Sequence, residues 1–123
     1  MAVFYTTIGQ ARIVDYIDGT ATPGSHTINA GTGAVAAGVA STSLSTVVSE
    51  SAVAATKSQP SANVNRWVGT QTYTGSKTIT NAGVFTEASS VLLLIGDGLS
   101  IAVTADDSIQ FTFELEQIDV SEV

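Results

Sequence analysis

The stretch Ile109–Glu116, with the sequence IQFTFELE, decides the fold class of this chain. Apolar and polar side chains alternate along it without a break. Its apolar members are Ile109, Phe111, Phe113 and Leu115. This period of two is typical of a β-strand that buries one face and leaves the other in water. The pair Asp106-Asp107 just before it indicates a tight turn, so we expect a strand that starts directly after a turn.

Two further strands are expected immediately upstream. The run Val91–Ile95 is apolar at every position, which favours a central strand buried on both faces. Leu99, Ile101 and Val103 then alternate with small or polar residues, as in a half-buried strand. Gly96-Asp97-Gly98 lies between the two runs, and glycine adopts positive φ at little cost. The pattern therefore predicts a hairpin turn at this insert.

Strand signals continue toward the middle of the chain. Asn65–Thr74 is rich in aromatic and β-branched residues, which favour strands. Lys77–Ile79 and Val84–Thr86 predict two short strand pieces with a bend or bulge at Asn81-Ala82-Gly83 between them. From Asn65 onward, about five or six strands follow one another at short spacing, which is typical of an antiparallel sandwich or barrel.

The first half of the chain gives weaker signals. Ser25–Ala30 predicts a strand that ends at Gly31-Thr32-Gly33. Residues 33–62 are rich in alanine, serine and threonine, and we expect an extended strap there because Gly38 and the serines disfavour a long helix. Residues 1–24 are expected to form an N-terminal arm with a first β-prone stretch. We therefore expect an all-β fold, with residues 25–123 forming an antiparallel β-sandwich of jelly-roll-like or Ig-like type.

Composition excludes several classes of function. The 123 residues include no cysteine, one histidine and only four Lys and Arg, against 11 Asp and Glu. Without cysteine there are no disulfides, thiolate metal sites or cysteine nucleophiles. Four scattered basic residues cannot form the stripe that nucleic-acid binding needs. Val91–Ile95 is far too short to span a membrane, and Met1–Tyr5 lacks the features of a secretory signal. We expect a protein made in a cytoplasm, with neither nucleic acid nor membrane as partner.

Acidic residues are concentrated toward the C-terminal end. Residues 82–123 contain eight Asp and Glu and no Lys or Arg, although the formal net charge of the whole chain is only −7. Such a region either meets solvent or faces a basic partner surface, and both readings stay open.

No catalytic residue is expected. His26 is the lone histidine, and no Gly-x-Ser-x-Gly elbow accompanies it. Of the carboxylate pairs that glycoside hydrolysis would need, Asp106-Asp107 lies in a predicted turn. The other pair, Glu114 and Glu116, lies on the solvated face of a predicted strand.

No metal or cofactor is expected either. Asp97, Asp106 and Asp107 lie in loops and carry the oxygen ligands that calcium prefers, but they read better as turn formers because no Asp-x-Asp-x-Asp loop exists. Gly31-Thr32-Gly33 lacks the Gly-Lys-Ser/Thr ending of a phosphate loop.

Five residues are candidates for contact with a partner. Val3, Phe4 and Tyr5 lie in the β-prone arm, which can add to the sheet edge of a neighbouring subunit. The cation Arg66 stands beside the large aromatic Trp67, which makes the pair a candidate surface contact. Alternatively, Trp67 and Tyr73 can line a sugar site, although aromatic residues in strands belong more often to the core.

The order of these signals resembles a group of short β-rich structural proteins of tailed phages. The resemblance covers roughly residues 25–117 and rests on turns and strands. The residues that carry it are Thr27–Gly33, then Leu44 and Glu50, then Thr78–Phe85, Leu92-Leu93-Leu94 and Asp106–Phe113. Residues 1–24 fall outside it.

The resemblance implies a non-enzymatic virion protein. The members of this group are capsid decoration (cement) proteins or tail and fibre components. We therefore expect a cement protein that binds the outer capsid lattice, with the major capsid protein and copies of itself as partners. The alternative is a tail, baseplate or fibre domain that binds a receptor carbohydrate. Either function places the protein in the virion after assembly in the host cytoplasm.

Overall fold

The computed structural model describes residues 1–87 and 91–117, and strands dominate it. About 52% of the described residues are in strands, and the one helix among them is short, which confirms the all-β class. The elements are β1 (Ala2–Tyr5), α1 (Thr7–Asp18), β2 (Thr27–Gly31), β3 (Val53–Ala54), β4 (Thr56–Ser61), β5 (Val64–Thr72), β6 (Lys77–Thr86), β7 (Val91–Val103) and β8 (Ser108–Glu116).

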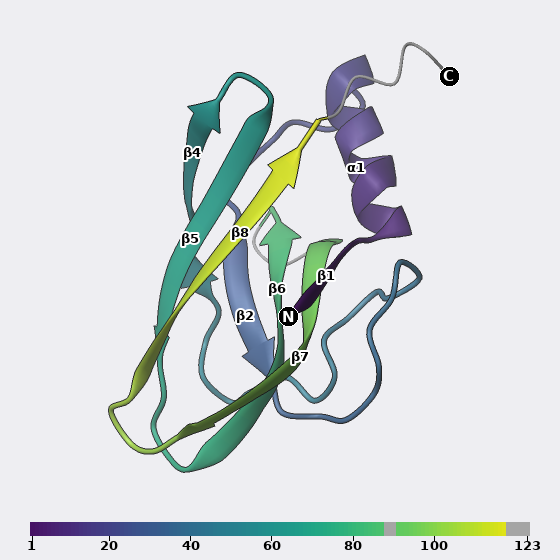
Figure 1. The fold of residues 1–123 in the computed structure, drawn as a ribbon. Helices are drawn as coiled ribbons and strands as arrows, with labels where there is room; N and C mark the ends of the chain where they lie inside the picture. The colour runs from purple at the N-terminus through teal and green to yellow at the C-terminus, as the bar shows by residue number, and fades with distance from the viewer. Residues whose placement is uncertain (88–90, 118–123) are drawn as a thin grey trace.

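The strands form two antiparallel sheets with one core between them (Figure 1). The larger sheet has the order β1-β7-β6-β2-β3, and the smaller sheet has the order β4-β5-β8. One cluster of buried apolar side chains joins Ile28 and Leu94 of the larger sheet to Trp67 and Phe113 of the smaller one. The alternation predicted for Ile109–Glu116 is confirmed, because Phe111 and Phe113 are buried there while their neighbours are exposed.

The hairpin predicted at Gly96-Asp97-Gly98 is wrong. β7 runs through this insert as one strand of 13 residues. Gly98 has a φ of 79°, but the chain bulges there and does not reverse. Opposite it, the pairing with β6 shifts between Ile79 and Asn81, so β7 carries extra residues against Thr80. The glycines therefore serve a bulge, which is the other common use of positive φ in a strand. The two strand pieces predicted around Asn81-Ala82-Gly83 form one continuous β6, and its pairing with β7 is irregular between Ile79 and Asn81 and between Val84 and Phe85.

Residues 1–24, expected as an arm with a first β-prone stretch, contain one strand and one helix. Ala2–Tyr5 pairs with β7 of its own sheet, from Ala2 opposite Asp97 to Tyr5 opposite Leu94. The next residues form α1, which the sequence reading missed. Thr6 caps this helix by accepting a hydrogen bond from the Gly9 amide at 2.9 Å. Its hydroxyl also donates to the Leu92 carbonyl at 2.6 Å, which attaches the start of the helix to β7.

Residues 32–52 form the long irregular segment of the described chain, and β3 and β4 follow it. The segment is tied to the larger sheet. Asn81, which is buried, accepts from the Ser45 amide and donates to the Ser45 carbonyl, both at 3.1 Å. Leu44 and Val48 are buried within the core. The region expected as one strap at 33–62 thus divides into an irregular part and two strands.

Candidate functional site

The sheets present four edge strands, and three of them are protected against pairing with another chain. β1 has four residues and β3 has two, so both offer little backbone. β4 is longer, but it carries Lys57 and Pro60, and its pairing with β5 shifts between Ser58 and Ser61. Short length, lysine, proline and bulges are the features by which natural sheets prevent edge-to-edge association.

β8 has none of these protections. All nine residues from Ser108 to Glu116 pair with β5 in one uninterrupted register. The strand contains neither lysine nor proline. Within the described residues, no backbone group pairs with its second edge. Alternate N–H and C=O groups of a strand point to each side, so half of the β8 backbone is open to a new partner.

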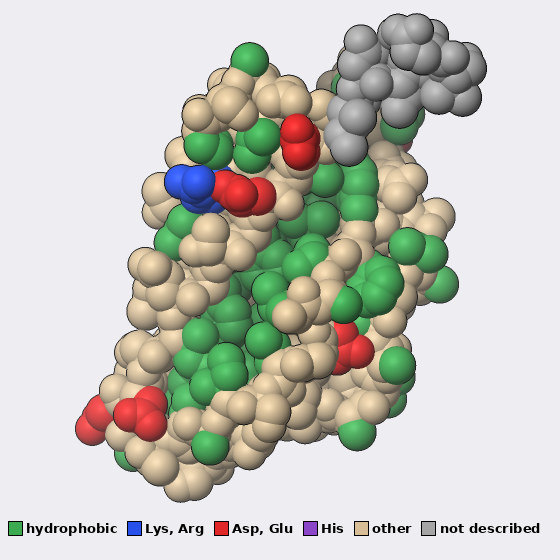
Figure 2. Space-filling model, in the orientation of Figure 1, with side chains coloured by type: hydrophobic (Ala, Val, Ile, Leu, Met, Phe, Trp, Pro, Cys, Tyr) green, Lys and Arg blue, Asp and Glu red, His purple; other side chains and the backbone are tan. Residues whose placement is uncertain are grey.

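An apolar band runs beside this free edge (Figure 2). It lies between β8 and the elements β7, β1 and α1, at the place where the smaller sheet ends. We call this surface the seam and define it by six partly buried apolar side chains that pack against the core. They are Tyr5, Ile13, Leu99, Ile101, Ile109 and Leu115.

Acidic groups surround the seam (Figure 2). Glu114 and Glu116 lie on the exposed face of β8, and Asp106 and Asp107 lie in the turn before it. Glu114 meets one cation, because Arg66 Nη2 lies 2.7 Å from its Oε2. In the described C-terminal part, residues 91–117, there is no lysine or arginine at all. The surroundings of the seam are therefore suited to a basic partner.

His26 lies just before β2 and is buried against Trp67 of β5. Trp67 Nε1 donates a hydrogen bond to His26 Nδ1 at 2.8 Å, and the two rings are stacked with centroids 6.0 Å apart. Indole N–H is a donor only, so the neutral imidazole carries its proton on Nε2. Burial, followed by the nearby charge of Lys57, lowers the pKa of His26. The imidazole thus has a lowered affinity for a proton, and its Nδ1 is occupied by the N–H of Trp67.

A cleft of about 320 Å³ opens beside this pair. α1 contributes Ile13 and Tyr16 to its wall, β8 contributes Leu115, and His26 and Trp67 form part of its floor. The lining is mostly apolar. His26 Nε2 is buried and has no hydrogen-bond partner among the described residues. Leu115 and Ile13 belong to both the cleft and the seam, so the two surfaces are continuous.

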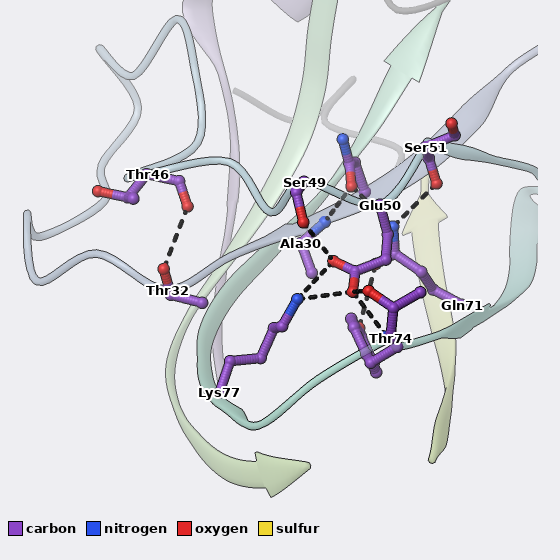
Figure 3. Close-up of polar contacts among 11 residues, drawn as sticks. Ala30, Thr32, Thr46, Ser49, Glu50, Ser51, Gln71, Thr74 and Lys77 are labelled. Atoms are coloured by element: carbon purple, nitrogen blue, oxygen red, sulfur yellow. Dashed lines mark hydrogen bonds and ion pairs between the residues drawn. The ribbon is translucent and has the colours of Figure 1, made fainter. Parts of the chain in front are cut away.

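A second polar cluster holds the end of the irregular segment (Figure 3). Lys77 Nζ lies 2.6 Å from Glu50 Oε2, and the side chains are only 18% and 6% exposed. The Thr74 amide donates to the same carboxylate oxygen at 2.8 Å. The bond from Lys77 and the Thr74 amide lower the pKa of Glu50 to about 2. The Glu50 carboxylate accepts from the Lys77 ammonium and from Thr74, so this cluster ties the irregular segment to the start of β6.

The structure separates the five residues predicted for partner contact. Val3 is 46% exposed, whereas Phe4 and Tyr5 are half-buried and Tyr5 contributes to the seam. Arg66 is accessible but bound to Glu114. Trp67 is 3% exposed and lies mostly in the core, and it reaches the surface only in the lining of the cleft.

The alternative sugar site loses its aromatic residues as well. Tyr73 is fully buried, and its hydroxyl donates to Gln71 Oε1 at 3.1 Å. Burial raises the pKa of Tyr73 to about 12, with a smaller effect from Glu50. Neither Tyr73 nor Trp67 presents a ring face to solvent, which stacking on a sugar would require.

The three aspartates considered for calcium do not meet. Asp97 accepts a hydrogen bond from the Ala37 amide at 2.9 Å, and this bond together with one from Gly98 lowers its pKa. Asp107 instead accepts from the Thr104 amide at 2.8 Å within its own turn. Among residues 1–87 and 91–117, no three acidic or histidine side chains lie close enough to hold a metal ion. In the same part of the chain, no helix has the length and hydropathy that crossing a bilayer requires.

The sequence did not predict the free edge of β8 or the seam, because neither corresponds to a local sequence pattern. The absence of lysine and proline from Ile109–Glu116 was the available signal, but it gains meaning only when β8 is known to be an edge. The candidate site is therefore an apolar surface along the free edge of a strand, and acidic side chains border it. No protein-family model, curated protein or solved structure matches this chain significantly.

Proposed function

We propose that this protein is a non-enzymatic structural protein of a virion, a cement protein that binds the outer capsid lattice. Its partners are the major capsid protein and neighbouring copies of itself. It assembles in the host cytoplasm and remains in the virion. The proposal combines the resemblance of residues 25–117 to phage structural proteins with the geometry of β8.

The free edge of β8 beside the seam carries this proposal. A long, regular edge next to uncovered apolar side chains is a hazard for a free monomer, but it is an advantage for a protein that works in contact with others. Many copies on a symmetric shell turn a modest contact into high avidity. The occupied state of His26 supports a role without chemistry, because the lone imidazole is engaged with Trp67.

The finer architecture is part of the same proposal. We take the two facing sheets as a β-sandwich, of jelly-roll-like or Ig-like type. Residues 32–52 then act as a strap across the larger sheet, fixed by Asn81 at one point and by Lys77 at another. The exposed Val35 and Val39 of this segment are available to a neighbouring subunit. In place of the expected arm, β1 leaves Val3 accessible at the edge of the larger sheet.

Reconstitution on capsid shells tests the function. Shells are purified from particles assembled without this protein, mixed with the pure protein, and sedimented. We expect saturable cosedimentation and a higher melting temperature of the shell. Isolated tails from the same particles are the control. Binding to tails and not to shells, or binding to a glycan array without shell binding, would overturn the proposal in favour of the receptor-binding alternative.

A further inference from the structure

The smaller sheet is too narrow to cover the larger one. It has three strands against five, and it ends at β8. Figure 1 shows β1 and α1 beyond β8, and no strand of the smaller sheet lies over them. Tyr5 and Ile13 come from these two elements and are only half-buried as a result. The seam is therefore the place where one more strand would complete the smaller sheet.

The backbone of β8 can bind such a strand. Its pairing with β5 is regular over all nine residues, so its outer edge is equally regular. An added strand gains main-chain hydrogen bonds along this edge. Every second side chain of that strand would face the core side. There it would cover Leu99 and Ile101 of β7, and Ile109 of β8, which are half-buried now.

Charge decides what the other side chains of the added strand should be. They would lie beside Glu114 and Glu116 on the exposed face, and opposite charges in neighbouring strands stabilise a sheet. Arg66 of β5 already forms an ion pair with Glu114, with Nη2 lying 2.7 Å from Oε2. No described cation lies within ion-pair distance of Glu116. Lysine or arginine at alternate positions would complement this acidic border.

We propose that the outer edge of β8 and the seam receive an extended, basic segment of a capsid subunit as an additional β-strand. The inference rests on the proposed function, since that function supplies the subunit. A second copy of β8 is a poorer occupant, because it brings two more glutamates and no cation.

A synthetic strand tests the docking directly. The probe is a peptide of about ten residues, long enough to span β8, that alternates valine with lysine and threonine. We expect the amides of β8 to shift in the NMR spectrum and to gain protection from hydrogen exchange, while those of β4 stay unchanged. The same peptide with glutamate for lysine should bind about tenfold more weakly. Equal binding of both peptides, or protection at β4 and not at β8, would overturn the inference.

A matched pair of variants tests whether the peptide and the shell bind to the same surface of the protein. Ile109→Lys places a charge inside the seam and should abolish binding of both the peptide and the shell. Val47→Lys adds the same charge at a side chain that is 50% exposed and outside the seam, and it should leave peptide binding unchanged. Circular dichroism establishes that both variants are folded. A second seam variant, Leu99→Lys, replaces Ile109→Lys if the latter unfolds.

The outcomes separate the two proposals. If Ile109→Lys binds shells like the wild type, the docking inference fails and the cement function stands. If the wild type takes up the peptide at β8 but ignores shells, the function fails and the docking surface stands. Dimerisation of the free protein through β8, detected by light scattering and blocked by Ile109→Lys, would show that a second copy is the occupant and overturn the inference.

Discussion

β4 and β8 are the two edges of the same three-stranded sheet, and they are built in opposite ways. β4 is fully exposed, contains Lys57 and Pro60, and pairs irregularly with β5. β8 contains neither residue type, pairs regularly, and lies beside apolar side chains left uncovered. The features that protect a sheet edge are therefore present at β4 and absent from β8. This asymmetry indicates which side is available for association.

The largest effect on the free energy of unfolding is expected at Phe113, and it tests how strongly β8 is held in the isolated protein. Phe113 is 2% exposed and lies in the common core. Phe113→Ala should lower the free energy of unfolding by about 3–5 kcal/mol, measured by urea denaturation. Thr112→Ala on the exposed face of the same strand is the control and should change little. A small effect at Phe113 would mean that β8 is loosely held and that the comparison with β4 overstates its order.

The next largest effect on stability is expected at Glu50, whose ion pair with Lys77 holds the irregular segment in the isolated protein. Glu50→Gln should cost about 2–3 kcal/mol, because it leaves the ammonium of Lys77 without its ion pair in a mostly buried place. The folded-state pKa of about 2 is below the ordinary value of 4.5. This contribution to stability is therefore full above pH 4.5 and is lost as the pH falls toward 2. Acid unfolding of the wild type and of Glu50→Gln should converge at low pH, and parallel curves would contradict the assignment.

A smaller effect is expected at His26, beneath the cleft where β8 ends. Folding lowers the pKa of His26 below 6.5, so the unfolded chain takes up the proton first and stability falls as the pH drops below 6.5. His26→Gln keeps an acceptor for Trp67 and removes the titration. It should cost about 1 kcal/mol and flatten the pH dependence above pH 5. If the melting temperature of His26→Gln falls between pH 7 and pH 5 as steeply as that of the wild type, a group other than His26 causes the pH dependence.

The smallest effects on stability belong to the exposed edges themselves. Pro60→Ser in β4 and Gln110→Lys in β8 should each change the free energy of unfolding by less than about 0.5 kcal/mol. Their effects on association should differ. Removing the proline exposes β4 to pairing and should raise self-association, whereas adding a lysine to β8 should weaken binding of the valine–lysine peptide and leave self-association unchanged. Light scattering and peptide titration measure the two effects, and equal behaviour of the two variants in both measurements would remove the contrast between the edges.

The sequence predicted those parts of the fold that depend on neighbours along the chain. Alternation at Ile109–Glu116 and the turn at Asp106-Asp107 were read correctly, because side-chain period and turn chemistry are local. α1 was missed because its apolar residues do not form a clear stripe. Val14 and Ile17 remain exposed, although the cap from Thr6 to the Gly9 amide is local in the sequence.

The candidate site was largely beyond the reach of sequence reasoning. The aspartate and glycines at 96–98 suit a hairpin and a bulge equally well, and only pairing with β6 selects the bulge. His26 and Trp67 lie 41 positions apart, and no spacing rule joins them. The seam combines Tyr5 and Ile13 with Ile109 and Leu115, so it exists only after both ends of the chain have met. Composition indicated an acidic region, but the fold determines that it borders an open edge.

The attachment of Thr6 to the Leu92 carbonyl, 86 positions later in the chain, has a consequence for biosynthesis. The first strand leaves the ribosome long before its pairing partner exists, so it must wait for most of the polypeptide to be made. Such distant pairings slow folding. The surface that Tyr5 helps to form is therefore completed only near the end of translation, and until then β1 remains without its partner strand.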